Sequence, residues 1–232
     1  KHSLRIGEGV SSRNSVRRSL KDIEPVLVQK DIENPGELCI EYEDIRKLVD
    51  QEEIRKHKLS YSVAVVRPHR LGIEYMKTAG CCTCRSTGVL QQVLLGEAWY
   101  ILQKASGNNQ RKIEDVIFLK AGRGEKIVIP PDYAYAIVNV TNSDLVISGW
   151  ESFAFRKNIK KASRKNYPGF FTCGCDSYQK TKGAAYFILE DELGERFEIN
   201  PNYEFVPYMR LASPNNAMRA FGLEIGVPIY DL

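Results

Sequence analysis

The chain has 232 residues, with 33 basic and 29 acidic side chains and a formal net charge of +4. Hydrophobic residues make up 43% of it and charged residues 27%, which is typical of a globular domain and excludes a disordered or collagen-like chain. It contains neither the ~18 consecutive apolar residues of a membrane helix nor the apolar core of a signal peptide, so we expect a cytoplasmic protein with no membrane partner.

The first quarter of the chain differs in texture from the rest. Residues 1–24 are rich in Ser and Arg and have almost no apolar periodicity, which predicts a flexible basic arm. Residues 25–60 are predicted to form an N-terminal extension with one helix over 44–58. Asp44 can cap this helix, and its apolar residues Ile45, Leu48, Val49 and Ile54 fall near one face.

Short segments rich in Val, Ile, Tyr and Phe then recur about every ten residues, with Gly, Pro, Asn and Asp between them. They cover residues 61–67, 72–78, 88–95, 98–104, 113–119, 125–129, 133–140, 143–150, 184–190 and 195–199. Many short strands with turn residues between them are typical of an antiparallel sandwich or barrel. The sequence therefore predicts an all-β fold, with the barrel over residues 61–200.

Two segments interrupt or follow the strand pattern. Residues 156–165 have six basic side chains in ten positions, which predicts a solvated loop; phosphate, RNA or an acidic protein is the alternative partner. Since no recognition motif accompanies this segment, we do not expect nucleic-acid binding. The proline-containing residues 201–232 are predicted to be an irregular tail that wraps the barrel.

Several blocks occur in a characteristic order: LGIEYMKTAG at 71–80, GEAWYILQ at 96–103, GRG at 122–124, IPPDYAY at 129–135 and VN at 138–139. In order and spacing they resemble the cupin-type (archaeal-type) glucose-6-phosphate isomerase family over about residues 40–200. The resemblance implies a double-stranded β-helix, or jelly-roll barrel, usually a homodimer, with a metal and a sugar-phosphate site inside the barrel mouth. Such a barrel can enclose a small ligand.

The resemblance also identifies a substituted metal site. Family members carry three His and one Glu at the positions that hold Cys81, Thr83, Val89 and Tyr135 here. A valine cannot bind a metal or transfer a proton, and a neutral hydroxyl is a poor replacement for imidazole. The sequence therefore leaves two functions open: a sugar-phosphate isomerase or binder, and a non-catalytic cupin that acts as a structural or regulatory binding module.

Four residues are predicted to bind substrate. Thr78, Gly80 and Tyr178 match family positions that contact the sugar phosphate, and Tyr135 replaces a metal ligand. The alternative is that the tyrosines are only core aromatics. The Arg67-Pro68-His69-Arg70 stretch is predicted to be a solvated turn, with a phosphate-binding mouth as the alternative, because Arg can bind phosphate with two parallel hydrogen bonds.

Five of the six cysteines form two clusters, Cys81-Cys82-Thr83-Cys84 and Cys173-Gly174-Cys175. If the two clusters meet at the barrel mouth, Cys81, Cys84, Cys173 and Cys175 could bind zinc, or iron in a cluster, through four thiolates. Disulfides and buried thiols without a function are the two alternatives.

Overall fold

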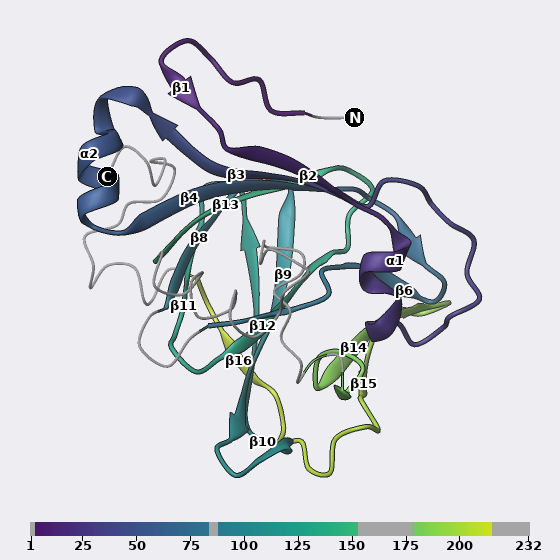
Figure 1. Cartoon of the computed structure of the whole chain (residues 1–232). Coiled ribbons are helices and arrows are strands. Elements are labelled where there is room, and N and C mark those ends of the chain that lie inside the picture. The colour runs from purple at the N-terminus through teal and green to yellow at the C-terminus, as the bar shows by residue number, and fades with distance from the viewer. Residues whose placement is uncertain (1–2, 84–87, 153–177, 179, 215–232) are drawn as a thin grey trace.

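The computed structural model describes residues 3–83, 88–152, 178 and 180–214, and its strands form two sheets (Figure 1). The strand pairs are antiparallel, except that the last short strand runs parallel to its neighbour. The basic segment 156–165 lies outside the described residues. Within the described part of the chain, no helix has the length and apolar character needed to cross a membrane.

The seven-stranded sheet contains the N-terminal strands. Its spatial order is β1 (Val10–Ser11), β3 (Cys39–Lys47), β4 (Leu59–Val66), β13 (Leu145–Ser152), β8 (Val89–Leu95) and β11 (Lys126–Ile129), and β2 (Asn14–Arg18) pairs with β3.

The nine-stranded sheet contains the remaining strands. Its order is β15 (Gly194–Ile199), β14 (Tyr186–Asp191), β6 (Glu74–Lys77), β12 (Ala134–Asn139), β9 (Glu97–Ser106), β10 (Asn109–Gly122) and β16 (Arg210–Ala212), and β5 (Arg70–Leu71) and β7 (Cys81–Cys82) pair with β6 and β12. The helical elements are short: α1 (Leu20–Ile23), α2 (Gln51–Lys56) and the 3-10 turns η1 (Glu24–Val26) and η2 (Leu48–Asp50).

The inner faces of the two sheets meet in one apolar core. Alternate residues of β4, β8 and β13, such as Ala64, Val93 and Ile147, pack in the same cluster as Tyr100 and Ile137 of the opposite sheet. Successive side chains of a strand point to opposite faces, so this alternation decides which residues fill the barrel. The all-β, jelly-roll prediction is confirmed, and each of the ten predicted strand segments contains a strand.

The predicted helix over 44–58 is mostly wrong. β3 continues to Lys47, and only Gln51–Lys56 forms an α-helix. Asp44 does not cap a helix: it has a positive φ of 54° and lies at a register shift where Ile45 pairs with Tyr61. Strand pairing with β4 and β1 outweighs the local helical pattern, and Val49 is 88% exposed.

The predicted flexible arm over 1–24 also differs from the structure. β2 pairs with β3 along its whole length, from Asn14 opposite Glu43 to Arg18 opposite Cys39. Arg18 is only 6% exposed and donates two hydrogen bonds to Glu41, at 2.9 and 2.8 Å. Because β2 and β3 belong to the sheet, the barrel begins well before residue 61. A buried ion pair and strand pairing, rather than apolar periodicity, order this segment.

The described part of the predicted wrapping tail, residues 201–214, contacts the barrel through β16 and β10. Arg210 donates two hydrogen bonds to the carboxylate of Asp115, at 2.8 and 2.7 Å, and the Tyr133 hydroxyl donates a third at 2.7 Å. The hydrogen bonds from Arg210 lower the pKa of Asp115, although burial alone would raise it. In the same cluster, burial and the Asp115 carboxylate raise the pKa of Tyr133 to about 12.

This arrangement predicts how Asp115 stabilises the fold at different pH. Its pKa is lower in the folded chain than the ordinary 3.8, so the carboxylate stabilises the fold above that pH and less as the pH falls below it. We expect Asp115→Asn to be less stable than the wild type at about pH 6, and the difference to shrink towards about pH 3. Urea unfolding at several pH values measures this, and a difference that grows on acidification would contradict it.

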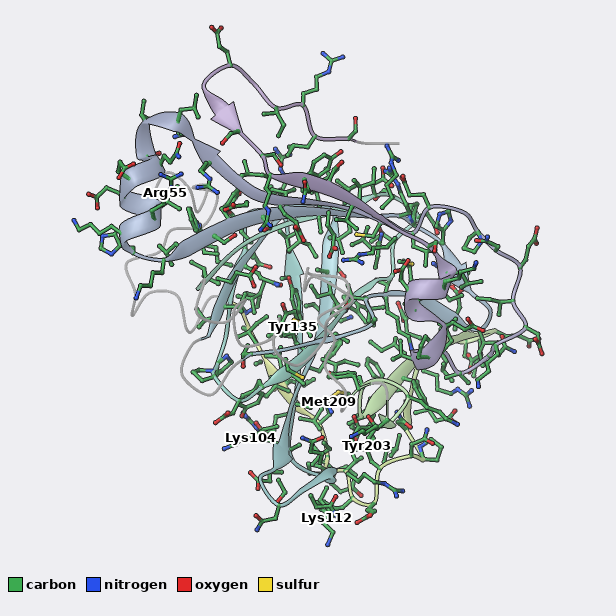
Figure 2. All side chains as sticks on the ribbon, in the orientation of Figure 1. Arg55, Lys104, Lys112, Tyr135, Tyr203 and Met209 are labelled. Carbon is green, nitrogen blue, oxygen red and sulfur yellow. The ribbon has the colours of Figure 1, made fainter. Side chains whose placement is uncertain are left out.

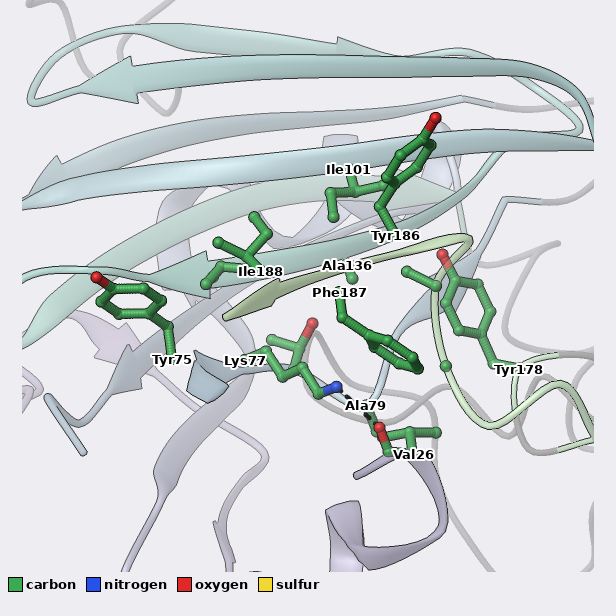
Figure 3. A pocket seen from close by; sticks show the side chains of 14 residues that line it. Val26, Tyr75, Lys77, Ala79, Ile101, Ala136, Tyr178, Tyr186, Phe187 and Ile188 are labelled. Atoms are coloured by element: carbon green, nitrogen blue, oxygen red, sulfur yellow. Dashed lines mark hydrogen bonds between the residues drawn. The ribbon is translucent and has the colours of Figure 1, made fainter. Parts of the chain in front are cut away.

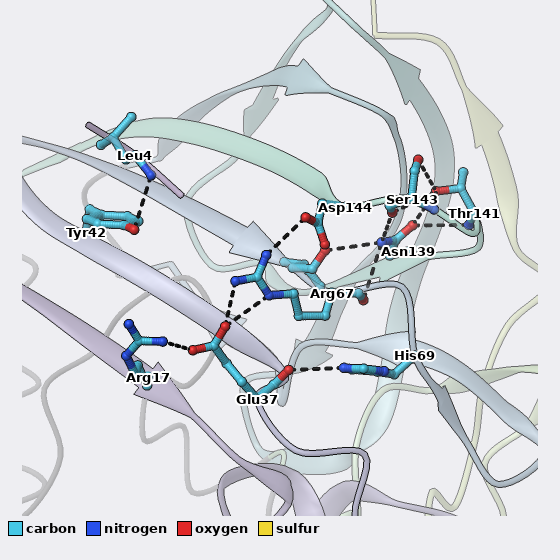
Figure 4. Close-up of polar contacts among 11 residues, drawn as sticks. Leu4, Arg17, Glu37, Tyr42, Arg67, His69, Asn139, Thr141, Ser143 and Asp144 are labelled. Carbon is cyan, nitrogen blue, oxygen red and sulfur yellow. Dashed lines mark hydrogen bonds and ion pairs between the residues drawn. The ribbon is translucent and has the colours of Figure 1, made fainter. Parts of the chain in front are cut away.

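Arg67, at the end of β4, joins three segments that are far apart in sequence (Figure 4). Its guanidinium donates to Glu37, at 3.0 and 2.6 Å, and to Asp144 at 3.0 Å, and it is 3% exposed. Arg17 binds the other oxygen of Glu37. Burial raises the pKa of Glu37, but the two arginines outweigh burial and lower it.

The other two polar side chains of the predicted turn, His69 and Arg70, also have protein partners. His69 Nε2 lies 3.1 Å from the carbonyl oxygen of Glu37, and Arg70 donates to Glu190 at 2.6 Å and covers the Tyr75 ring. Because Arg67 and Arg70 both pair with carboxylates, the arrangement does not favour the phosphate-binding mouth.

Removing one carboxylate from Arg67 should destabilise the chain strongly. We expect Asp144→Ala to lower the free energy of unfolding by about 3 kcal/mol, because the buried guanidinium loses a charged partner. The matched control is Glu52→Ala, which breaks an exposed pair with Arg55 and should cost no more than about 0.5 kcal/mol. Urea unfolding compares the two variants, and equal effects would contradict the assignment.

Candidate functional site

Three of the four positions with substituted metal ligands lie together inside the barrel. Cys81, Val89 and Tyr135 belong to one buried cluster, with exposed fractions of 2%, 4% and 2%. Cys81 is opposite Tyr135 in the pairing of β7 with β12. Figure 2 shows Tyr135 in the middle of the molecule, among the side chains that fill the space between the strands. The site that the resemblance implies is therefore a packed part of the core.

The hydroxyls at this site already have protein partners. Gln91 Nε2 donates a hydrogen bond to the Tyr135 hydroxyl at 3.3 Å. Thr83 Oγ1 lies 2.8 Å from the carbonyl oxygen of Pro130 and accepts a hydrogen bond from the Tyr133 amide at 3.1 Å. Thr83 thus ties two loops together.

The donor set does not fit the divalent metal of an open catalytic site. Such a site needs imidazole and carboxylate ligands, whereas these positions provide a thiol, two hydroxyls engaged with other groups, and an aliphatic side chain. Among the residues that the structure describes, no group of three or more His, Cys, Asp and Glu side chains could hold a metal ion.

Most of the cysteines that are predicted to bind a metal lie outside the residues that the structure describes. Cys84, Cys173 and Cys175 lie there, and Cys81 is buried, with its sulfur 4.0 Å from the carbonyl oxygen of Cys82. Cys82 is disulfide-bonded, which agrees with the disulfide alternative for one residue of the first cluster. Cys39 is a buried free thiol whose pKa is raised well above its ordinary value by burial. Zinc or iron binding by the cysteines stays a prediction.

Three of the predicted substrate residues lie together on the other side of the nine-stranded sheet from Tyr135. Thr78 and Tyr178 line a cavity under β14, and the Tyr178 ring stands against Gly80 (Figure 3). The cavity holds about 10 Å³, which is about the room that one water molecule needs. Thr78 Oγ1 accepts a hydrogen bond from the Ile137 amide at 3.0 Å. The structure therefore brings three predicted residues together and separates Tyr135 from them.

Sequence reasoning did not identify Lys77, which lines this cavity. Its ammonium group donates to the carbonyl oxygen of Val26 at 2.8 Å, pairs with the buried Glu74 and lies 5.1 Å from the centre of the Phe187 ring. Successive side chains of β6 point to opposite faces of the sheet. Met76 faces the barrel, so Lys77 lies on the outer face. Lys77 is thus fully engaged in joining the N-terminal segment to the sheet.

Sequence reasoning also missed a larger open groove, of about 560 Å³, beside the turn between β9 and β10. Gln103 lines it, donates to the Tyr203 hydroxyl at 2.8 Å and accepts from the Ala185 amide at 2.7 Å. Its other lining residues include Lys104, Gln110 and Glu114. The groove depends on the contact of residue 203 with β9, which no local sequence pattern indicates.

The close approach of Tyr178 to Gly80 gives a stability prediction. Gly80 has a φ of +95°, and a Cβ there would lie 2.8 Å from the Tyr178 ring. We expect Gly80→Ala to lower the free energy of unfolding by about 3 kcal/mol, because the alanine would have both a strained backbone and a clash with the Tyr178 ring. The matched control Gly194→Ala has a φ of +111° and open space around it, and should cost about 1 kcal/mol.

Thermal and urea unfolding of the two glycine variants test this. If both lose the same stability, Tyr178 does not press on Gly80. The double variant Gly80→Ala with Tyr178→Ala should remove the part of the cost that comes from the clash.

Comparison with protein families matches residues 30–204 to the family described as glucose-6-phosphate isomerase (GPI), which is more than half of the chain. The chain belongs to this family. Its resemblance to the cupin-type members, identified from the blocks around Thr78 and Gly96, is confirmed. No curated protein matches the sequence.

The solved structures that match this glucose-6-phosphate isomerase family member resemble it only distantly. Oxalate decarboxylase from Bacillus subtilis is 10% identical over 68% of this chain and 32% of its own, with a TM-score of 0.38. Vicilin from hazelnut, Corylus avellana, is 18% identical over 51% and 31%, with a TM-score of 0.37. Drosophila melanogaster CENP-C bound to CAL1 is 18% identical over 41% and 61%, with a TM-score of 0.31. The chain therefore spans less than two thirds of each of these structures.

Proposed function

We propose that this chain is a non-catalytic cupin, a structural or regulatory binding module that keeps the fold of its family without the isomerisation chemistry. The observation that carries the proposal is the packing of Cys81, Val89 and Tyr135 in the barrel core. Isomerisation moves a proton between adjacent carbon atoms, and it needs a group that can accept and return that proton. Val89 cannot do so, and Tyr135 is a buried phenol bound to Gln91.

The second candidate function is a sugar-phosphate isomerase of the glucose-6-phosphate and fructose-6-phosphate class. Family membership over residues 30–204 favours it, together with the convergence of Thr78, Gly80 and Tyr178. The small volume of the cavity beside these residues supports the binding module instead, because a sugar phosphate is many times larger than one water molecule. A homodimer, a cytoplasmic location and a cysteine-bound metal stay predictions.

Turnover of fructose-6-phosphate separates the two functions. The purified full chain is assayed with added Mn²⁺, Zn²⁺ or Fe²⁺ and after treatment with a chelator, with a heat-inactivated sample as the control. We expect no turnover above that control under any of these conditions. Turnover that a metal supports and a chelator abolishes would overturn the proposal and establish the isomerase.

The metal content of the same preparation tests the cysteines independently. Elemental analysis for zinc and iron is combined with thiol titration in denaturant. A stoichiometric metal that is released when Cys81→Ser replaces the wild type would support ligation by the cysteines. Absence of metal from protein purified without chelator would exclude that ligation but leave the binding module as proposed.

A further inference from the structure

The strand β15 forms one edge of the nine-stranded sheet and is exposed along its length. Among the strands that the structure describes it pairs only with β14, and Figure 1 shows the two at one side of the molecule. Residues Glu195 to Ile199 are all exposed, and Leu193, in the turn before the strand, is 99% exposed. An edge strand presents backbone amides and carbonyls to which another strand can bind. The open edge of β15 is therefore a surface for strand addition.

The hydrogen bonds of the β14–β15 hairpin decide which backbone groups point outwards. Opposite residues of an antiparallel pair alternate between hydrogen-bonded and non-hydrogen-bonded pairs. At the end of this hairpin the Asn200 amide donates to the carbonyl oxygen of Ala185 at 2.9 Å. The even-numbered residues of β15 therefore bond to β14, whereas the amides and carbonyls of Glu195, Phe197 and Ile199 point away from it.

The side chains of β15 alternate between two faces. Phe197 faces the sheet, where its ring is stacked 6.1 Å from the ring of Trp99 on β9. Arg196 and Glu198 therefore lie on the opposite face, with their charged groups 3.4 Å apart and exposed fractions of 54% and 51%. The guanidinium of Arg196 also lies 3.5 Å from Asp191. Exposed ion pairs of this kind contribute little free energy, so both side chains can pair with a neighbouring strand.

The order of the charges makes this edge complementary to itself. When two copies pair antiparallel with Phe197 opposite Phe197, Arg196 of each copy lies opposite Glu198 of the other. Two opposite-charge pairs then form on one face of the joined sheet, with Cβ atoms about 5 Å apart. The outward backbone groups of Glu195, Phe197 and Ile199 form about six hydrogen bonds between the copies.

Charge and backbone chemistry disfavour the neighbouring registers. A pairing centred on Arg196 places two guanidinium groups opposite each other, and a pairing centred on Glu198 places two carboxylates opposite each other. The second of these also puts Pro201, which has no amide hydrogen, opposite Glu195. Among these registers, only the one centred on Phe197 combines opposite charges with complete backbone pairing.

We propose that two copies of this chain associate edge to edge through β15, about a two-fold axis at Phe197, and that Arg196 and Glu198 select this register. The nine-stranded sheets of the two copies then form one continuous sheet. The family resemblance implies a homodimer but no surface for it, whereas the open edge and its charges assign β15. This association is independent of the proposed function, because β15 lies outside the barrel core that carries that function.

Sedimentation equilibrium of the full chain tests the charges. We expect the wild type to dimerise, and Arg196→Glu or Glu198→Arg alone to raise the dissociation constant about tenfold or more, because each creates two like-charge pairs. An equimolar mixture of these two variants should dimerise, as should the double variant, because the facing charges are again opposite. The matched control Glu52→Arg makes the same change on the exposed helix α2 and should stay within about twofold of the wild type.

The variant Ile199→Pro tests the backbone pairing separately. Proline at this position removes an outward-pointing amide and keeps the hydrogen bonds between β15 and β14. We therefore expect the chain to stay folded, as near-UV circular dichroism shows, and its dimer to be weakened.

Three results would overturn the proposal. They are a wild type that stays monomeric at high micromolar concentration, a dimer that neither single charge variant weakens, and single charge variants that do not dimerise when they are mixed. The proposed function fails on a different measurement, because metal-dependent turnover of fructose-6-phosphate would overturn the non-catalytic module and leave the association through β15 unchanged.

Discussion

The two facing sheets enclose a limited volume, and strand alternation decides which side chains share it. In this chain Val89, Tyr135 and Tyr100 take that volume, so the place where the family resemblance implies a metal is occupied by packed side chains. Protein interiors are packed as closely as organic crystals, which means that a phenol in the core leaves no room for an ion and its ligands. The loss of the family's metal site and the integrity of the barrel are therefore consequences of the same packing.

Buried polar groups are paired to different extents at the two ends of the barrel. Near the end of β4, the buried guanidinium of Arg67 binds two carboxylates, and Arg18 binds Glu41. At the other end of the inner face, Ser60 and Gln91 each have a buried oxygen without a partner in the described structure. The buried polar atoms at the first end are therefore paired with opposite charges, whereas these two oxygens at the second end are not.

The strands were predictable because their side-chain pattern repeats over short distances. Each of the ten segments from 61–67 to 195–199 contains a strand, since two-residue alternation and turn residues are local signals. The helix expected over 44–58 was mostly wrong, because β3 continues to Lys47: Ile45 pairs with β4, and Arg46 and Lys47 pair with β1. The pairing of β2 with β3 was missed for a related reason: Arg18 is buried by its ion pair with Glu41, and charge patterns read alone indicate exposure.

The sequence by itself determined the fold class, the family and the substitution of the metal ligands at Cys81, Thr83, Val89 and Tyr135. Only the tertiary structure decided that Tyr135 and Tyr178 lie on opposite faces of the nine-stranded sheet, and that Glu43 and Gln91 share the barrel interior with Tyr100. The physical reason is that residue types and alternation are properties of single strands. Which side chains meet, and which polar atoms are left without a partner, depends on strand register and on how the two sheets close over each other.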